Sequence, residues 1–409
     1  MGLVKKIRAK IAWGAVAPEV IMVTNSFVWI IFTFSILGAI INNMGIHEIE
    51  KTILFLIFFM AVGVSAVFGA KFFPRARIRS LQAWFLTGAI ATYLLTFVPN
   101  NSMIVAFVLI SFYGASVGIG LPSCLSYFAE SVNVEKRGFI SGIIWSGVGF
   151  FILFFAFLTT ILTQWATIVA IVIWRFSGGI AFILLNRKKE ESTIRESPSY
   201  FEIFRKREVL LYLFPWALFC LLNYAEAPVV ESFFGPDFVF FQIIVWSIVG
   251  FVATIGGFIA DIKGRKAVVI AGFLMLGIEY AAVSILQNSE ATMYFFSVLD
   301  GISWGLLSSV FLTTIWGDLG ENHEKEKYYV VGGLTFFLPG FLSELIAYYV
   351  GVISTTLAFS LASFFLFLAV LPLVYAPETL PEIKIRERHI KTYLKKAQIV
   401  KEKHTLTNK

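Results

Sequence analysis

Long apolar segments with almost no charge recur along the whole chain, as at 20–41, 52–70 and 150–162. A helix needs about 20 apolar residues to cross the hydrocarbon core of a bilayer. Only 14% of the 409 residues are charged and 58% are hydrophobic, whereas a soluble domain carries roughly 25% charged residues. Too few charges remain to cover a water-facing surface, so the sequence predicts an integral membrane protein.

Twelve segments of the chain have the length and hydropathy of transmembrane helices. Their connections fall alternately on two sides, and one side collects 31 of the 33 Lys and Arg residues. Positive charge in short loops marks the cytoplasmic face. We therefore expect an all-α polytopic protein of the cell membrane with both termini cytoplasmic and spans at roughly 17–41, 52–70, 81–98, 103–128, 139–162, 165–186, 209–231, 237–260, 267–287, 291–316, 328–350 and 353–376.

The net charge of +7 is explained by this topology and by contact with anionic lipids. We therefore expect the bilayer as a partner and no nucleic acid. Residues 3–15 are expected to lie on the inner surface as a basic amphipathic segment. The sequence contains no metal-binding spacing of His and Cys, no nucleophile elbow and no phosphate-binding loop. We therefore expect no metal, no cofactor and no enzymatic activity.

The longest basic connection divides the predicted spans into six and six. This organisation gives an N-terminal six-helix bundle at 1–186, a cytoplasmic linker at 187–208, a C-terminal six-helix bundle at 209–376 and a basic cytoplasmic tail at 377–409. At an offset of 187 residues, Gly114 and Gly118 fall on Gly301 and Gly305. Matched glycines in matched spans indicate a parallel repeat of six helices.

The stretch at 256–266, Gly-Gly-Phe-Ile-Ala-Asp-Ile-Lys-Gly-Arg-Lys, is similar to the cytoplasmic signature of the major facilitator superfamily. Gly257 permits close approach of two helices, and Gly264 permits a sharp reversal of the chain. The Asp261 carboxylate is able to accept hydrogen bonds from an arginine or from the exposed amides of a neighbouring helix. The resemblance implies that this cluster, with Arg265 and Lys266, holds the cytoplasmic side closed.

The corresponding stretch of the first half has Phe73 where the signature has its aspartate. We therefore expect the gate to rest mainly on the second-half copy. Glu130 and Arg137 resemble the E…RG loop of sugar and organic-ion members, and Asp318 is the second-half counterpart of Glu130. Residues 377–382 resemble the P-E-T motif of sugar porters. The resemblance implies the fold of this superfamily and points in motif to its sugar porters and metabolite:proton symporters.

Five acidic residues lie inside predicted spans of the second half. An ionised side chain in mid-span costs roughly 3 kcal/mol, which makes such residues candidates for function. A protonatable carboxylate in a low-dielectric cavity can cycle its proton as access alternates. We therefore expect a proton as the coupling ion. Glu226 and Asp300 rank first, Glu344 and Glu231 next, and Glu279 last because its span is usually peripheral in the superfamily.

Polar residues beside a proline break in the seventh span, Asn223 and Tyr224, are candidates for binding substrate. Asn25 and Trp29 of the first span are candidates for the opposite wall. Arg175 of the sixth span either holds a substrate carboxylate or phosphate in bidentate fashion or makes a structural contact.

These features together predict a secondary active transporter, monomeric, with a small-molecule substrate. The residues favour symport of a small polar organic solute, a sugar or an organic acid, with protons by alternating access. An efflux antiporter for amphipathic compounds is the first alternative. The aromatic content of 17% favours it, and the absence of proline from 142–155 disfavours it, since drug–proton antiporters carry one there. A membrane sensor that binds without transporting is the second alternative.

Overall fold

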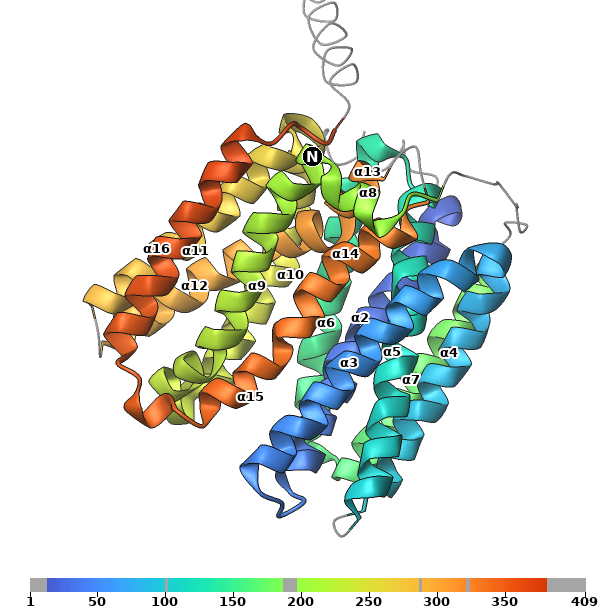
Figure 1. The fold of residues 1–409 in the computed structure, drawn as a ribbon, viewed down its shortest axis with the longest axis horizontal. Helices are drawn as coiled ribbons and strands as arrows, with labels where there is room; N and C mark the ends of the chain where they lie inside the picture. The colour runs from blue at the N-terminus through green and yellow to red at the C-terminus, as the bar shows by residue number, and fades with distance from the viewer. Residues whose placement is uncertain (1–12, 100–101, 187–196, 287–288, 321–323, 381–409) are drawn as a thin grey trace, which may run out of the picture.

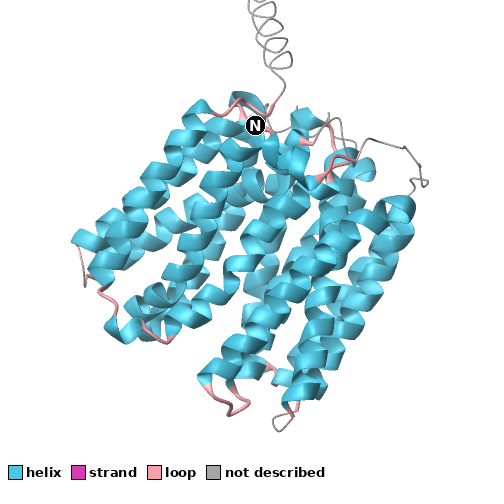
Figure 2. Cartoon of the chain, viewed as in Figure 1, coloured by secondary structure: helices cyan, strands magenta, loops and turns pink. Residues whose placement is uncertain are grey.

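The computed structural model describes residues 13–99, 102–186, 197–286, 289–320 and 324–380. All regular structure in these ranges is helical (Figure 2). The basic segment before residue 13, the linker at 187–196 and the tail after residue 380 lie outside the described residues. The N-terminal helices are α2 (Trp13–Asn42), α3 (Glu48–Phe72), α4 (Arg77–Leu94), α5 (Met103–Ser131), α6 (Val134–Ile161) and α7 (Gln164–Leu185).

The second part of the chain begins with a short helix, α8 (Tyr200–Arg205), which a capping box starts at Ser199. A single 3₁₀ turn at Leu338–Gly340, which contains Pro339, separates α14 from α15, so the predicted span at 328–350 is interrupted. The C-terminal helices are α9 (Arg207–Phe234), α10 (Phe238–Lys263), α11 (Arg265–Ile285), α12 (Glu290–Leu307) with its extensions η4 (Ser308–Ile315) and α13 (Trp316–Leu319), α14 (Glu326–Phe337), α15 (Phe341–Ala347) and α16 (Thr355–Tyr375).

Ten helical segments of the described residues have the length and hydropathy to cross a membrane. Two of them contain a pair of helices each. The segment Glu48–Phe97 contains α3 and α4 around a turn at Phe73–Ala76, and Arg207–Lys263 contains α9 and α10 around a turn at Gly235–Asp237. The prediction of an all-α membrane protein is thus confirmed. The count of twelve spans and the side on which the termini lie stay predictions.

The glycines that align between the two halves pack equivalent helices. Gly114 and Gly118 of α5 lie against backbone carbonyls of α3, and Gly301 and Gly305 of α12 lie against backbone carbonyls of α10. A side chain at Gly114, Gly118 or Gly301 would collide with that backbone or with its neighbours, and a side chain at Gly305 would make a tight contact. Close helix contact through small residues is the usual packing device in membranes. The same device therefore closes the matching pair in each half.

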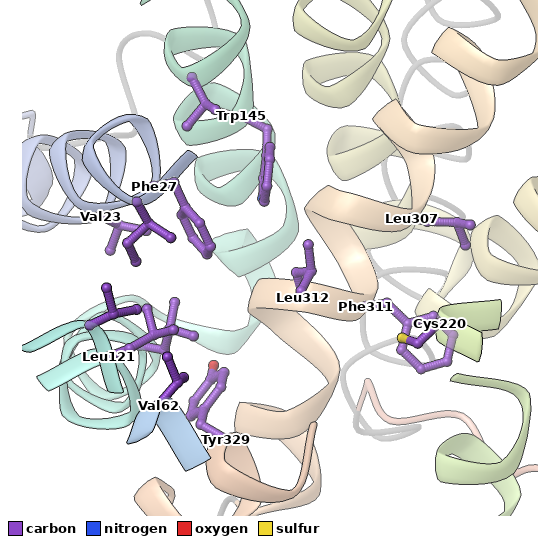
Figure 3. Packing of buried hydrophobic residues seen from close by; sticks show 14 of the residues in the cluster. Val23, Phe27, Val62, Leu121, Trp145, Cys220, Leu307, Phe311, Leu312 and Tyr329 are labelled. Carbon is purple, nitrogen blue, oxygen red and sulfur yellow. The ribbon is translucent and has the colours of Figure 1, made fainter. Parts of the chain in front are cut away.

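The N-terminal and C-terminal helices meet along α6 and α10 and along α3, α14 and α15 (Figure 1). Apolar side chains line much of the space between them: the Phe27 and Trp145 rings lie 4.8 Å apart, close to Leu312 of η4 (Figure 3). The loops that join α3 to α4, α5 to α6 and α10 to α11 lie at one end of the molecule, the upper end in Figure 1. We call this the basic end, because these loops and the helix ends that flank them carry most of the described Lys and Arg residues.

Candidate functional site

A cavity of about 380 Å³ lies between the N-terminal and the C-terminal helices. This volume is within the range of small-molecule sites. Aromatic and aliphatic side chains from α2, α3, α6, α9, α10, α12 and α14 make up most of its wall. Asp300 is the only charged residue among the described residues that line it. The polar side chains of the wall are Asn223, Tyr224, Gln242, Asp300 and Ser308.

The residues predicted to bind substrate separate into two groups. Asn223 and Tyr224 of α9 line the cavity, although α9 continues through Pro228 without the interruption that the sequence suggests. The predicted residues of the first half, which are Asn25, Trp29 and Arg175, are not part of its wall. They pack against one another inside the N-terminal helices instead.

Arg175 is fully buried near the centre of α7. Its guanidinium donates to the side-chain oxygens of Asn25 at 3.2 Å and Ser26 at 2.8 Å. Within the part of the chain that the structure describes, no carboxylate forms an ion pair with it. Cation–π attraction replaces the missing anion, with the guanidinium carbon 4.1 to 4.2 Å from the rings of Trp29, Trp84 and Phe85. This environment favours the structural role for Arg175.

Three acidic residues gather beside the cavity on α9, α11 and α12. Asp300 lines the cavity, and Glu279 lies behind it, fully buried and within electrostatic range of Asp300. Glu226 is 6% exposed, and Tyr280 lies within electrostatic range of all three acids. Among the described residues, neither carboxylate oxygen of Glu279 has a hydrogen-bond partner, and the Oε2 atom of Glu226 has none either. No described Lys or Arg forms an ion pair with any of the three.

Glu231 and Glu344 do not belong to this cluster. Glu231 is exposed near the end of α9, and Glu344 of α15 lies within its electrostatic range. Glu48 and Lys51, at the start of α3, act on Glu344 as well. Both acids therefore lie at the end of the molecule opposite to the basic end.

At the basic end, four charged side chains join the two sets of helices, and we call them the latch: Arg137, Asp261, Arg265 and Asp318. Asp318 pairs with Arg137 of α6 and with Arg265 of α11, at 3.3 Å in the second case. Arg265 also pairs with Asp261 at 2.6 Å. All four residues are at least 94% buried. Breaking such pairs would leave buried charges uncompensated, which is costly.

Asp261 contacts an arginine and the backbone amides of a neighbouring helix, the two kinds of donor that the sequence suggests for it. It accepts from Arg265, and it accepts from the backbone amides of Gly138 at 3.0 Å and Phe139 at 2.7 Å. These amides belong to the first turns of α6, where the helix dipole favours a negative charge. Gly257 makes the approach possible, because its Cα lies against the Gly138 carbonyl, where a side chain would collide.

The reversal between α10 and α11 is held by the segment after α16. Gly264 has φ of +109°, a conformation that glycine adopts without strain. Glu378, in the stretch that resembles the P-E-T motif, accepts from the amides of Arg265 at 2.7 Å and Lys266 at 3.2 Å. It thereby caps the start of α11. The Lys266 ammonium donates to two backbone carbonyls at the end of α16, those of Val374 and Ala376.

The first-half copy also contributes an ion pair between the halves, in addition to the second-half copy on which the sequence mainly places the gate. Arg77 pairs with Glu130 at 2.7 Å and with Glu326 of α14 at 2.5 Å. The signature has an aspartate where this chain has Phe73. Glu326 of α14 provides a negative charge beside Arg77 in its place. Sequence reasoning missed Glu326 because it lies between two lysines in a basic loop, and only its position at the start of a helix distinguished it.

Comparison with known proteins identifies the family to which the chain belongs. The chain matches the family described as Major Facilitator Superfamily over residues 20–343. The match is to the superfamily as a whole and gives no support to the sugar-porter branch in particular. No curated protein sequence matches the chain.

Among solved structures, the chain is similar to the crystal structure of the human organic anion transporter MFSD10 (TETRAN), with a TM-score of 0.59 and 12% identity. The similarity covers 88% of this chain and 98% of the other. At this identity the likeness concerns the fold alone, which agrees with the family match. The chain belongs to the major facilitator superfamily, a family of secondary transporters and not of enzymes.

Proposed function

We propose that the protein exchanges protons for organic cations that have an aromatic or otherwise apolar body. The observation that carries the proposal is the charge of the cavity wall, where Asp300 is the only charged residue among those described. Aromatic rings make up much of the remaining wall, and ring faces attract cations in water-excluded sites. This is the amphipathic antiporter that the sequence leaves as an alternative, and we prefer it to symport of a sugar or organic acid.

The acidic cluster supports protons as the coupling ion. Two neighbouring buried carboxylates without a cation cannot both stay ionised at low cost. Protons therefore occupy the cluster when no substrate is bound. In this scheme Asp300 binds either a proton or the positive charge of the substrate, and this competition couples their opposite movements. Because a single chain encloses the cavity, we propose that the monomer in the cell membrane is the transporting unit.

Symport of a small polar solute is the second candidate. Asn223, Tyr224 and Gln242 favour it, since each offers hydrogen bonds to the cavity. An organic anion, the substrate class of the similar human transporter, would meet the Asp300 carboxylate without a basic side chain on the described wall. We therefore place anions last.

A ligand-stabilisation experiment separates these classes. The purified protein is heated with three aromatic compounds of equal size, namely a quaternary ammonium, its neutral carbon isostere and a sulfonate, and also with a panel of sugars. We expect stabilisation by the ammonium alone, lost in Asp300→Asn and kept in the matched variant Glu231→Gln. Stabilisation by the sulfonate or by a sugar would contradict the proposal.

Flux in proteoliposomes then tests transport itself. An imposed proton gradient should drive the ammonium compound against its own gradient, and collapse of the proton gradient should abolish this accumulation. Binding of the ammonium without any counterflow would instead support the sensor.

A further inference from the structure

The helix that carries Asp300 changes its form between the cavity and the latch. At Ser308, α12 passes into η4 (Ser308–Ile315), which is a π-helix, and then into α13. Ser308 and Leu312 line the cavity, and Asp318 of the latch follows three residues after the π-helix ends. All eight residues of the segment are buried. One continuous element therefore connects the cavity wall to the latch.

A π-helix of this length needs support from its surroundings. Such helices are rare, are mostly confined to a single turn and occur often at functional sites. Here side chains bind carbonyls whose regular α-helical bonds are lost. Thr313 and Thr314 donate their hydroxyls to the Ser309 carbonyl at 3.0 and 2.9 Å.

Two further hydroxyls reach the segment from neighbouring helices. Ser141 of α6 donates to the Ser309 carbonyl at 2.7 Å and also contacts the Thr313 hydroxyl. Tyr329 of α14 donates to the Thr313 carbonyl at 2.7 Å. Ser141 belongs to the N-terminal helices, so this bond exists only while the two sets of helices are in contact near the basic end. The form of the segment is thereby tied to the closure of that end.

We propose that Ser141 and Tyr329 are positioning residues that hold Ser308–Ile315 as a π-helix while the basic end is closed. When the halves separate there, the freed carbonyls return to α-helical bonds. An α-helix turns about 100° per residue, and the wider π-helix turns less, so over eight residues the conversion rotates α13 by a large part of a turn. Asp318 then faces away from Arg137 and Arg265. The inference rests on the proposed transport cycle, since it links an occupied cavity to the release of the latch.

The test uses Ser141→Ala and Tyr329→Phe, each of which removes one hydroxyl and little else. Hydrogen exchange is measured on peptides covering 305–319, and basic-end opening is measured by labelling a cysteine introduced at Val132, which is 3% exposed beside the latch. We expect each variant to speed both exchange and labelling about fivefold, the effect of one net hydrogen bond. Ser141→Thr keeps the hydroxyl and should restore wild-type rates.

The matched control is Thr335→Ala, which removes a hydroxyl that binds the Val331 carbonyl within α14, outside the π-helix. It should leave both rates unchanged. The inference is overturned if Ser141→Ala and Tyr329→Phe leave exchange at 305–319 unchanged, or if they lower thermal stability without faster labelling. Neither readout depends on the substrate, so failure of the ammonium compound to bind would count against the proposed function alone.

Discussion

Replacement of Asp318 by asparagine tests whether the latch keeps the basic end closed. The Asp318 carboxylate is fully buried and pairs with Arg137 and with Arg265. In Asp318→Asn the amide keeps the shape but loses the charge. Arg265 retains Asp261 at 2.6 Å, whereas Arg137 retains only backbone carbonyls as described acceptors. The loss therefore falls mainly on Arg137.

Breaking a buried ion pair costs about 3–5 kcal/mol, and the amide still accepts a hydrogen bond, so about 3 kcal/mol is a reasonable loss for the closed state. Since about 1.4 kcal/mol corresponds to a factor of ten, the ratio of open to closed basic ends should rise roughly 100-fold. Solvation of the freed arginines in the open state is what permits the shift.

Labelling of a cysteine at Val132 with a maleimide measures this ratio. Cys124 and Cys220 are fully buried, and the parent protein gives their baseline. Asp237→Asn is the matched control, because Asp237 is exposed in the turn between α9 and α10, at the opposite end. A rise of less than threefold in Asp318→Asn, or an equal rise in Asp237→Asn, would refute the reasoning.

Three further changes probe the site. Asp300→Asn should abolish the pH dependence of ammonium binding together with most of the affinity, as measured by calorimetry at two pH values; unchanged binding would remove Asp300 from the coupling scheme. Glu326→Gln should open the basic end by about tenfold, less than Asp318→Asn, because Arg77 is partly exposed and keeps Glu130; the same labelling assay measures it. Gly257→Ala should favour the open basic end, since its methyl group collides with the Gly138 carbonyl; labelling at the wild-type rate would contradict this.

Much of the fold follows from hydropathy, because the cost of exposing polar backbone to lipid leaves helices as the form for long apolar segments. The predicted ranges match the helices closely where a segment is uniform, as in 165–186 and α7 (Gln164–Leu185). They fail where the helix changes form within an apolar run. The π-helix at Ser308–Ile315 and the turn at Leu338–Gly340 both lie inside predicted spans, and hydropathy is insensitive to such local changes.

The latch was partly predictable and the cavity much less so. The contacts of Asp261 were predictable from the sequence. One partner, Arg265, is only four residues away, and the others are amides near the start of a helix, where a carboxylate is favoured. Arg137 pairs with Asp318, which is 181 residues away in the sequence. Arg77 pairs with Glu326, which also belongs to the other half. Such pairs depend on how the halves meet. The position of Asn25 was not predictable for the same reason. Its polar side chain suggested a place in the cavity wall, and nothing in the sequence indicates that it contacts Arg175 instead.

The aromatic enclosure of Arg175 has a consequence for the response of the protein to voltage. A positive charge near the middle of α7 lies deep within the electric field of the membrane, and no described acid forms an ion pair with it. Moving one elementary charge across the whole membrane at 100 mV is worth about 2.3 kcal/mol. A rocking motion that carries Arg175 through a tenth of that distance changes the balance between conformations by roughly 0.2 kcal/mol. With such a motion, the membrane potential would bias the resting conformation even when no substrate or proton is moving.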